Sequence, residues 1–549
     1  MNIVAHWKFK RSSSSLVLVV CLSLGVPGFV AAETPATAAN KDRMPTTFEK
    51  SPITISKETT VIDGPVRPDG YIDYVAALNS QLSAGVTPEN NAAVLLLQVT
   101  GPREIPETGL ARYCARLGIP TIPAKGNYLT HLAYVGENAD PQEVDRLQKM
   151  EREMHDRPWT REEFPEGGRW LQENQKSYEL ALLMTKKTRY YAPLFTTWND
   201  ETGNDTGPVA GMLLPQAQTS RSVARLLAAH CFNEIAEGDL DTAWSDTQAM
   251  RRQARLIGQG CTLIDGLVGI AIDSMAANCE RSVINSPRLT REQAARYLES
   301  LQAWNPVCDI AGKVDVGERY MYCDSIGYLF RGGDDFFEMM GVGAGNNRLE
   351  KALFRAGMLG VDADEVLKVG NGWYDRMVAA LRTVDPEGRR VALKALDVEF
   401  RALKEKTTGT RGAITALVGD KTERGGLMGN VLVALMLPAV SAVNNAVDRS
   451  AATLDISRLG MAVRLYHFDH GQCPESLSAL VPKYIAEVPR DPHGVGEMHY
   501  VTEANTATIY SFGNDGIDNK GIGPNSSDSE RQQSTGDDIS GTFTFPAPR

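Results

Sequence analysis

Residues 427–443 read LMGNVLVALMLPAVSAV, and this apolar run continues into an amphipathic segment that ends at about Asp469. Five smaller pieces follow: a turn at 471–474, a helical piece over 477–481, a turn at 490–492, a hairpin-like pair of strands over 498–502 and 507–512, and an acidic loop over 515–538. A long helix in front of a short antiparallel sheet predicts a small α+β module, which we place at 427–546.

The helix prediction depends on spacing. Apolar residues recur three and four positions apart at Val440, Val443, Val447, Ala451 and Leu454, and Ile456, Leu459, Val463 and Tyr466 continue beside them. One helix therefore has a broad apolar stripe, which suits it to lie across a small sheet. Because 427–443 is short for a membrane span and contains Asn430 and Pro438, we expect a buried helix there, with a membrane segment as the alternative.

The order of these parts resembles the pseudopilins of type II secretion, above all the major pseudopilin, over about a fifth of the chain. The family motifs are matched by Tyr466, Asp469, Gly471 and Pro474, by Leu477 and Leu480, by Pro489, Asp491 and Pro492, by Tyr510, Ser511, Gly513, Asp515 and Gly516, and by Asp537, Asp538 and Ile539. The resemblance implies a pilin-like fold. In the family, however, the apolar helix is N-terminal and has Glu at its fifth position, whereas here the helix is internal and Val431 is fifth after Gly426. Processing into a pseudopilus is therefore not expected.

The same resemblance implies a calcium site, because the loop between the last two motifs binds calcium in the major pseudopilins. Carried over residue by residue, the predicted ligands are Asp515, Asp518, Asp537 and Asp538. Calcium takes six to eight oxygen ligands, and aspartate side chains together with turn carbonyls supply them. The alternative is an acidic loop without a ligand.

The N-terminus predicts export. Basic residues at Lys8, Lys10 and Arg11 precede an apolar region at 16–30 and a small-residue cleavage site before Glu33. An uncleaved N-terminal anchor is the alternative. Cleavage removes three basic residues and no acidic one, so the formal net charge goes from −11 to −14. No nucleic-acid partner is expected for so acidic a chain.

Helical periodicity dominates between these two ends and is clearest from Gln218 to Trp304. We predict a mainly α protein, with a signal peptide at 1–32, a flexible lead-in at 33–66, a large bundle or α-repeat-like domain at 67–411, a linker at 412–426 and the α+β module. Thr87 is expected to cap a helix that ends at Gly101. The segment 87–92 also looks like the start of a group of exported bacterial proteins of unknown function.

Enzyme motifs give no support for catalysis. The sequence contains no His-Glu-x-x-His, no Gly-x-Ser-x-Gly elbow and no phosphate-binding Gly-Lys-Ser/Thr loop, and the cysteines after residue 32 are seven in number, without Cys-x-x-Cys spacing. We therefore favour a non-enzymatic interaction or structural protein, whose partner is another protein or a cell-envelope component. An exported enzyme with its site in a cleft of the helical domain and a component of a type II secretion-like apparatus are the alternatives.

Overall fold

The computed structural model describes residues 51–132, 140–196, 207–331, 360–408, 419–436, 439–523 and 536–546. The predicted signal peptide at 1–32 lies outside these ranges. Contacts between its residues divide the chain as a whole into two compact units. Unit 1 combines 1–72, 322–371 and 400–440, and unit 2 combines 73–321, 372–399 and 441–549. Part of the predicted linker lies outside the described residues, and helix α19 (Lys421–Met436) begins within it.

The described residues are mainly helical and include a small three-stranded antiparallel sheet, as the sequence predicts in outline. The first half of unit 2 is helical from the start: α2 (Tyr74–Ser83), α3 (Ala92–Thr100), α4 (Glu107–Leu117), α5 (Pro141–Asp156), α6 (Pro165–Glu173) and α7 (Gln175–Thr185). Helix α5 begins at a typical cap, since the Asp140 side chain accepts a hydrogen bond from the amide of Gln142 and Pro141 occupies the first position.

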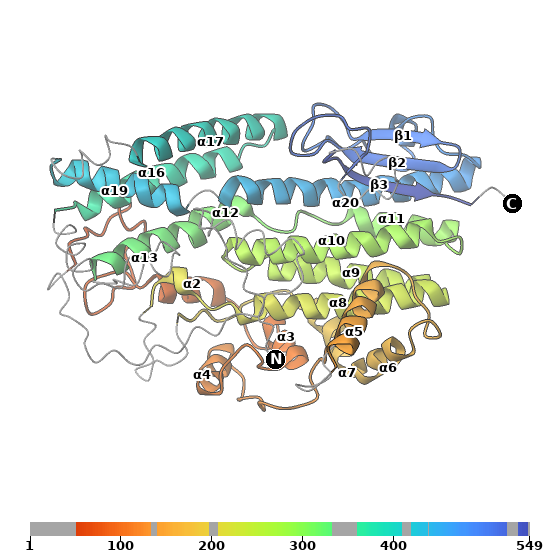
Figure 1. The fold of residues 1–549 in the computed structure, drawn as a ribbon, viewed down its shortest axis with the longest axis horizontal. Coiled ribbons are helices and arrows are strands. Elements are labelled where there is room, and N and C mark those ends of the chain that lie inside the picture. Colours follow the sequence, from red (N-terminus) through yellow and green to blue (C-terminus); the bar gives the residue numbers. More distant parts are fainter. Residues whose placement is uncertain are drawn as a thin grey trace. The chain divides into compact units, whose positions relative to one another are not determined.

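Four helices form the centre of unit 2: α8 (Pro215–Glu237), α9 (Leu240–Ile257), α10 (Leu263–Asn285) and α11 (Arg291–Gln302). The sequence specifies their ends. Gly238 has φ +96° and ends α8, Asp239 caps α9, and capping boxes begin α10 at Thr262 and α11 at Thr290. The short polar turns place α8, α9 and α10 side by side (Figure 1).

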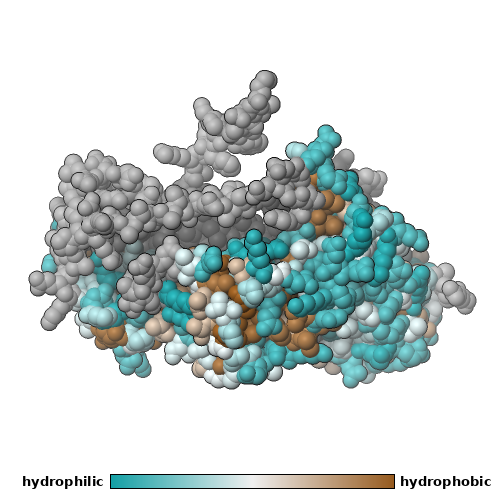
Figure 2. All heavy atoms as spheres, turned by 90° about the horizontal axis from the view of Figure 1, so that it is seen from below, coloured by the Kyte–Doolittle hydropathy of each residue, from teal (hydrophilic) through white to brown (hydrophobic). Residues whose placement is uncertain are grey.

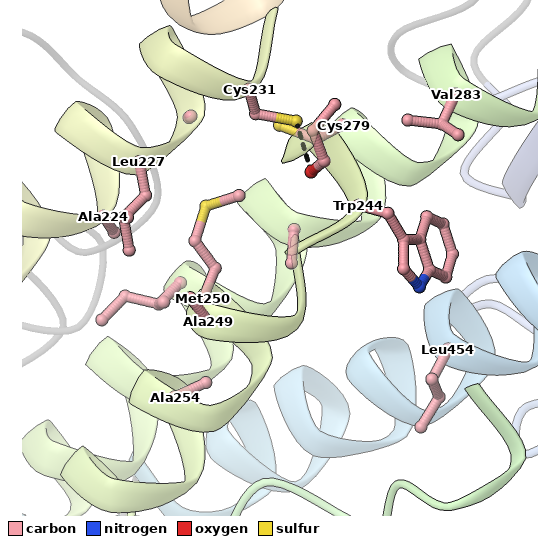
Figure 3. Packing of buried hydrophobic residues seen from close by; sticks show 14 of the residues in the cluster. Ala224, Leu227, Cys231, Trp244, Ala249, Met250, Ala254, Cys279, Val283 and Leu454 are labelled. Carbon is pink, nitrogen blue, oxygen red and sulfur yellow. Dashed lines mark hydrogen bonds between the residues drawn. The ribbon is translucent and has the colours of Figure 1, made fainter. Parts of the chain in front are cut away.

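The core of unit 2 lies between these helices. Val223, Leu227, Cys231 and Ile235 form one buried face of α8, as their spacing predicts. Figure 3 shows this face of α8 meeting α9 and α10, with the thiol of Cys231 donating to the carbonyl of Ala243 at 3.2 Å. No disulfide joins the described cysteines. Cys231 in α8 and Cys261 in the turn before α10 are both buried.

A buried ion cluster also joins α9 to α10. Arg251, which is fully buried, donates to Glu280 at 2.9 and 2.6 Å and to Asp273 at 2.6 Å. Arg255 donates to the other oxygen of Asp273 at 2.5 Å. Two cations therefore neutralise two carboxylates inside the bundle.

Helix α20 (Ala439–His470) continues this core into the C-terminal part. It is followed by a 3₁₀ turn (Leu477–Leu480) and by strands β1 (His499–Glu503), β2 (Thr506–Ser511) and β3 (Ile539–Thr544), in the order β1-β2-β3. The predicted long helix, short helical piece and hairpin are therefore present. The sheet packs on α20 through β3 (Figure 1), because a Cβ at Gly541 would lie 2.5 Å from Ile456 and a Cβ at Gly460 would lie 2.3 Å from the Phe543 ring.

One local prediction is wrong, and two elements were not predicted. Helix α3 is capped by Asn91 rather than Thr87, because the Asn91 side chain accepts from the amide of Ala93 while also donating to the carbonyl of Tyr191. The three-turn helix α4, which follows Gly101, was not predicted as a separate element. Strand β3 was not predicted.

Unit 1 is built around close helix contacts. Its helices are parts of α13 (Arg319–Phe330), α16 (Ala363–Leu381) and α17 (Pro386–Thr408), together with α19. A Cβ at Gly429 would lie 2.9 Å from the carbonyl of Val366, so α19 meets α16 where glycine allows it. The Asn371 side chain donates to the carbonyls of Glu58 at 2.9 Å and Thr59 at 2.7 Å, which fixes the described start of the chain on α16.

The surface of the described residues is mainly hydrophilic, as is usual for a folded chain. Figure 2 shows a mainly hydrophilic face with small, separate hydrophobic patches. Isolated patches of this kind need no partner to explain them.

Candidate functional site

The predicted calcium ligands lie where β2 ends and β3 begins. Pairing of Ser511 with Ile539 places the residues just after β2 next to those just before β3. Asp515 therefore lies near Asp537, and its amide donates to the Asp537 carboxylate at 3.4 Å. We call residues 513–523 and 536–538 the aspartate loop; the part of the predicted loop at 524–535 lies outside the described residues.

Glycine makes this close approach possible. A Cβ at Gly513 would lie 2.2 Å from both the carbonyl oxygen and Oδ1 of Asp537, nearer than any real side chain is found. Gly521 has φ +78° and donates its amide to Asp538 Oδ2 at 2.8 Å. These are turn positions that glycine alone fits without strain.

Asp538 and Asp537 face into the loop. Asp538 is 2% exposed, and its Oδ2 accepts from the amides of Asn519 at 3.1 Å and Gly521 at 2.8 Å. The Oδ1 atoms of both aspartates are buried and have no hydrogen-bond partner among the described residues. A buried carboxylate oxygen without a donor costs free energy, so this arrangement favours a cation at that place.

The negative charges of the aspartate loop also favour a cation there. Burial raises the pKa of Asp538 above the ordinary aspartate value; the two amide hydrogen bonds lower it, and the charges of Asp518 and Asp537 raise it again. The raised pKa means that ionising Asp538 is less favourable in the folded chain than in the unfolded chain. A divalent cation would reverse this balance.

The other two predicted ligands are more exposed. Asp515 accepts from the amide of Ile517, and Asp518 from the amide of Lys520, each at 2.8 Å, so both carboxylates shape the turn. The described residues contain no group of three or more His, Cys, Asp or Glu side chains already placed to hold a metal ion. A calcium site here would therefore need backbone carbonyls and water to complete its oxygen ligands. The residues offer such an ion two carboxylate oxygens that have no partner among the described residues.

A buried cluster next to the loop includes two of the motif residues. Asp491, 2% exposed, accepts from the amides of His493 at 2.8 Å and Phe512 at 2.9 Å and from the hydroxyl of Ser511 at 2.5 Å. His493 Nδ1 lies 3.0 Å from the same hydroxyl, and burial lowers the pKa of His493 to about 4. Because Ser511 is fully buried and donates to the carboxylate, this Ser–His–Asp set clamps the turn to β2 and offers no nucleophile to a substrate.

Another motif residue, Asp469, joins three elements. It accepts from Arg291 at 2.6 Å, from Lys483 at 2.7 Å and from the hydroxyl of Tyr484 at 2.7 Å, and these bonds hold the pKa of Asp469 well below its usual range. The motif spacing from Tyr466 to Asp469 is therefore a structural device at the end of α20. Sequence reasoning identified the position but not its partners.

His230 has a structural role, as its apolar helix suggests. Its Nδ1 lies 2.7 Å from Asp246, which is fully buried and also accepts from the Tyr178 hydroxyl at 2.9 Å. Burial lowers the pKa of His230, but the hydrogen bond and charge of Asp246 outweigh burial and raise it overall. This group joins α7, α8 and α9.

Among the described residues no helix has the length and apolar character needed to cross a membrane. Comparison with known proteins found no matching family model, no matching curated protein and no matching solved structure.

Proposed function

We propose that this chain is an exported, non-enzymatic interaction or structural protein whose C-terminal pilin-like part is ordered by a bound calcium ion. The partner would be another protein or a component of the cell envelope. One observation carries the proposal: Asp537 and Asp538, in a loop that also contains Asp515 and Asp518, each have a buried Oδ1 atom without a donor among the described residues.

The ion would order the ends of two strands. Asp537 and Asp538 directly precede β3, and their amides already bond to Asn519 Oδ1 at 3.2 Å and the Ile522 carbonyl at 3.3 Å. An ion held by these carboxylates joins the start of β3 to the turn after β2. Since β3 packs on α20, the ion would stabilise the attachment of the sheet to the helix.

Thermal unfolding of the full chain tests this proposal. A ligand that binds only the folded state stabilises it by about 2.7 kcal/mol at a hundredfold excess over its dissociation constant. We expect calcium to raise the midpoint relative to a chelator, and magnesium to do so less, because magnesium is smaller and loses water reluctantly.

The variant Asp538→Asn gives the sharpest comparison, since it is isosteric and removes one charge. In chelator it should be at least as stable as the wild type, because a disfavoured buried charge is lost; in calcium it should be less stable. Asp145→Asn, on the exposed surface of α5, is the matched control and should follow the wild type in both conditions. A wild-type midpoint that is the same in calcium and chelator would contradict the proposal.

Export is tested separately. The N-terminal residue of the protein recovered from the exported fraction should be Glu33. Recovery of the full chain with Met1 in the membrane fraction would support the uncleaved anchor instead.

A further inference from the structure

A cleft of about 690 Å³ lies in the helical part of unit 2 and shares no lining residue with the aspartate loop. Four segments line it: α2, residues 188–190, the end of α9 with the turn at 258–261, and residues 307–316. Its volume is in the range of sites for small organic molecules.

The cleft depends on unusually close backbone contacts. A Cβ at Gly317 would lie 2.1 Å from the carbonyl oxygen of Cys261, and one at Gly258 would lie 2.5 Å from that of Val307. Gly317 belongs to a π-helix (Val314–Glu318) that supplies one wall. Single π-turns within helices are rare and are frequent at functional sites.

Lys313 is the chemically distinctive residue of this cleft. It is 5% exposed, and its stem passes Gly266, where a Cβ would lie 3.2 Å from Lys313 Cε. Its ammonium donates to the carbonyl of Gly260. An ammonium has three N–H donors, so two are left without an acceptor among the described residues.

Three carboxylates lie around Lys313, and each accepts a hydrogen bond from another group. Asp309 lines the cleft and accepts from the amide of Gly312 at 3.0 Å, while Glu318 accepts from the amide of Leu263 at 3.2 Å. Asp265 accepts from the Thr262 hydroxyl at 2.7 Å. The remaining ammonium hydrogens can therefore be accepted by water or by a molecule in the cleft.

The rest of the lining is partly apolar, with Leu78, Leu82, Val307 and Val316 among its members. Arg189 and Arg255 also line the cleft, so its cations outnumber the single lining carboxylate, although Arg255 is paired with Asp273. A ligand that satisfies this lining has an anionic group and an apolar body.

We propose that this cleft binds a small organic anion, whose carboxylate accepts hydrogen bonds from Lys313 and whose apolar part contacts Leu82 and Val316. The inference is independent of the calcium proposal, because it concerns different residues. It assigns the helical part a ligand rather than a reaction.

Octanoate is the probe, and octanamide is its uncharged isostere. Titration calorimetry with the full chain should show saturable binding of octanoate and at least tenfold weaker binding of octanamide, because a charge-assisted hydrogen bond is lost. Octanoate should also slow the reaction of the half-buried Cys308, which lines the cleft, with N-ethylmaleimide.

Two variants locate the site. Lys313→Met keeps the length of the side chain and should weaken octanoate binding at least tenfold, whereas Lys149→Met, the same change at an exposed position on α5, should not alter it. Leu82→Trp should reduce binding by filling the cleft, and it remains informative where Lys313→Met fails to fold. Absence of saturable binding, equal affinity for octanoate and octanamide, or full binding by a folded Lys313→Met variant would each overturn the proposal.

Discussion

Removal of Arg251 should destabilise the chain more than any surface change. This side chain is fully buried and makes a bidentate pair with Glu280, also fully buried, through Nε at 2.9 Å and Nη2 at 2.6 Å. In Arg251→Met, Glu280 would lose both charge-assisted donors and remain as a buried charge. Asp273 would keep Arg255, so the damage should centre on Glu280.

The expected size follows from the burial of both partners. Breaking a buried ion pair by removing one partner costs about 3–5 kcal/mol, which is a large share of the roughly 5–15 kcal/mol that stabilises a typical folded protein. Replacing both partners by apolar residues is far less costly, because no uncompensated charge remains. The double variant Arg251→Met/Glu280→Met should therefore be more stable than Arg251→Met alone.

Urea unfolding followed by circular dichroism measures these free energies. Arg376→Met is the control, because Arg376 pairs with Glu399 at 2.7 Å while both side chains are about half exposed, and its loss should cost below about 1 kcal/mol. The reasoning would be refuted if Arg251→Met cost no more than this control. The reasoning would also be refuted if the free-energy costs of Arg251→Met and Glu280→Met, each measured alone, simply added in the double variant.

Three further outcomes are expected. Gly513→Ala should abolish the calcium-dependent rise in melting temperature, because its Cβ would lie 2.2 Å from Asp537, whereas Gly372→Ala, in a helix with open space around it, should leave that rise unchanged. Burial lowers the pKa of His493 to about 4, so this residue takes up a proton more readily in the unfolded chain than in the folded chain. The resulting stabilisation of the folded chain, up to about 3 kcal/mol, is present above pH 6.5 and is lost as the pH falls to 4. His493→Gln should therefore flatten the curve of stability against pH over that range. Asp469→Asn should lower the free energy of unfolding by about 1–2 kcal/mol, since three donors lose a charged acceptor. An unchanged urea midpoint would contradict this.

The helices that were predicted well are those whose ends are specified by local chemistry. Helices α8 to α11 carry regular apolar spacing and begin or end at capping residues such as Thr262, Thr290 and Gly238. The hairpin was predictable because alternation and a short polar turn are both local signals. Helix α3 shows the limit: its cap is Asn91 because that side chain also binds Tyr191, a hundred residues away along the chain.

The candidate site was predictable only in part. The motif positions placed Asp537 and Asp538 in one loop, but their burial follows from the pairing of β3 with β2, a strand the sequence did not reveal. Its signal was weak: Ile539, Phe543 and Phe545 alternate inward, with Gly541 between them. The Asp491–His493–Ser511 clamp and the cleft around Lys313 depend on contacts between distant segments, which spacing alone does not encode.

The calcium content of the full chain is the most direct test of the central proposal. After equilibrium dialysis at saturating calcium, metal analysis should find one calcium ion per chain, and none above background for the double variant Asp537→Asn/Asp538→Asn. A folded wild-type chain that retains no calcium above background, or a double variant that retains as much as the wild type, would contradict the assignment of the aspartate loop.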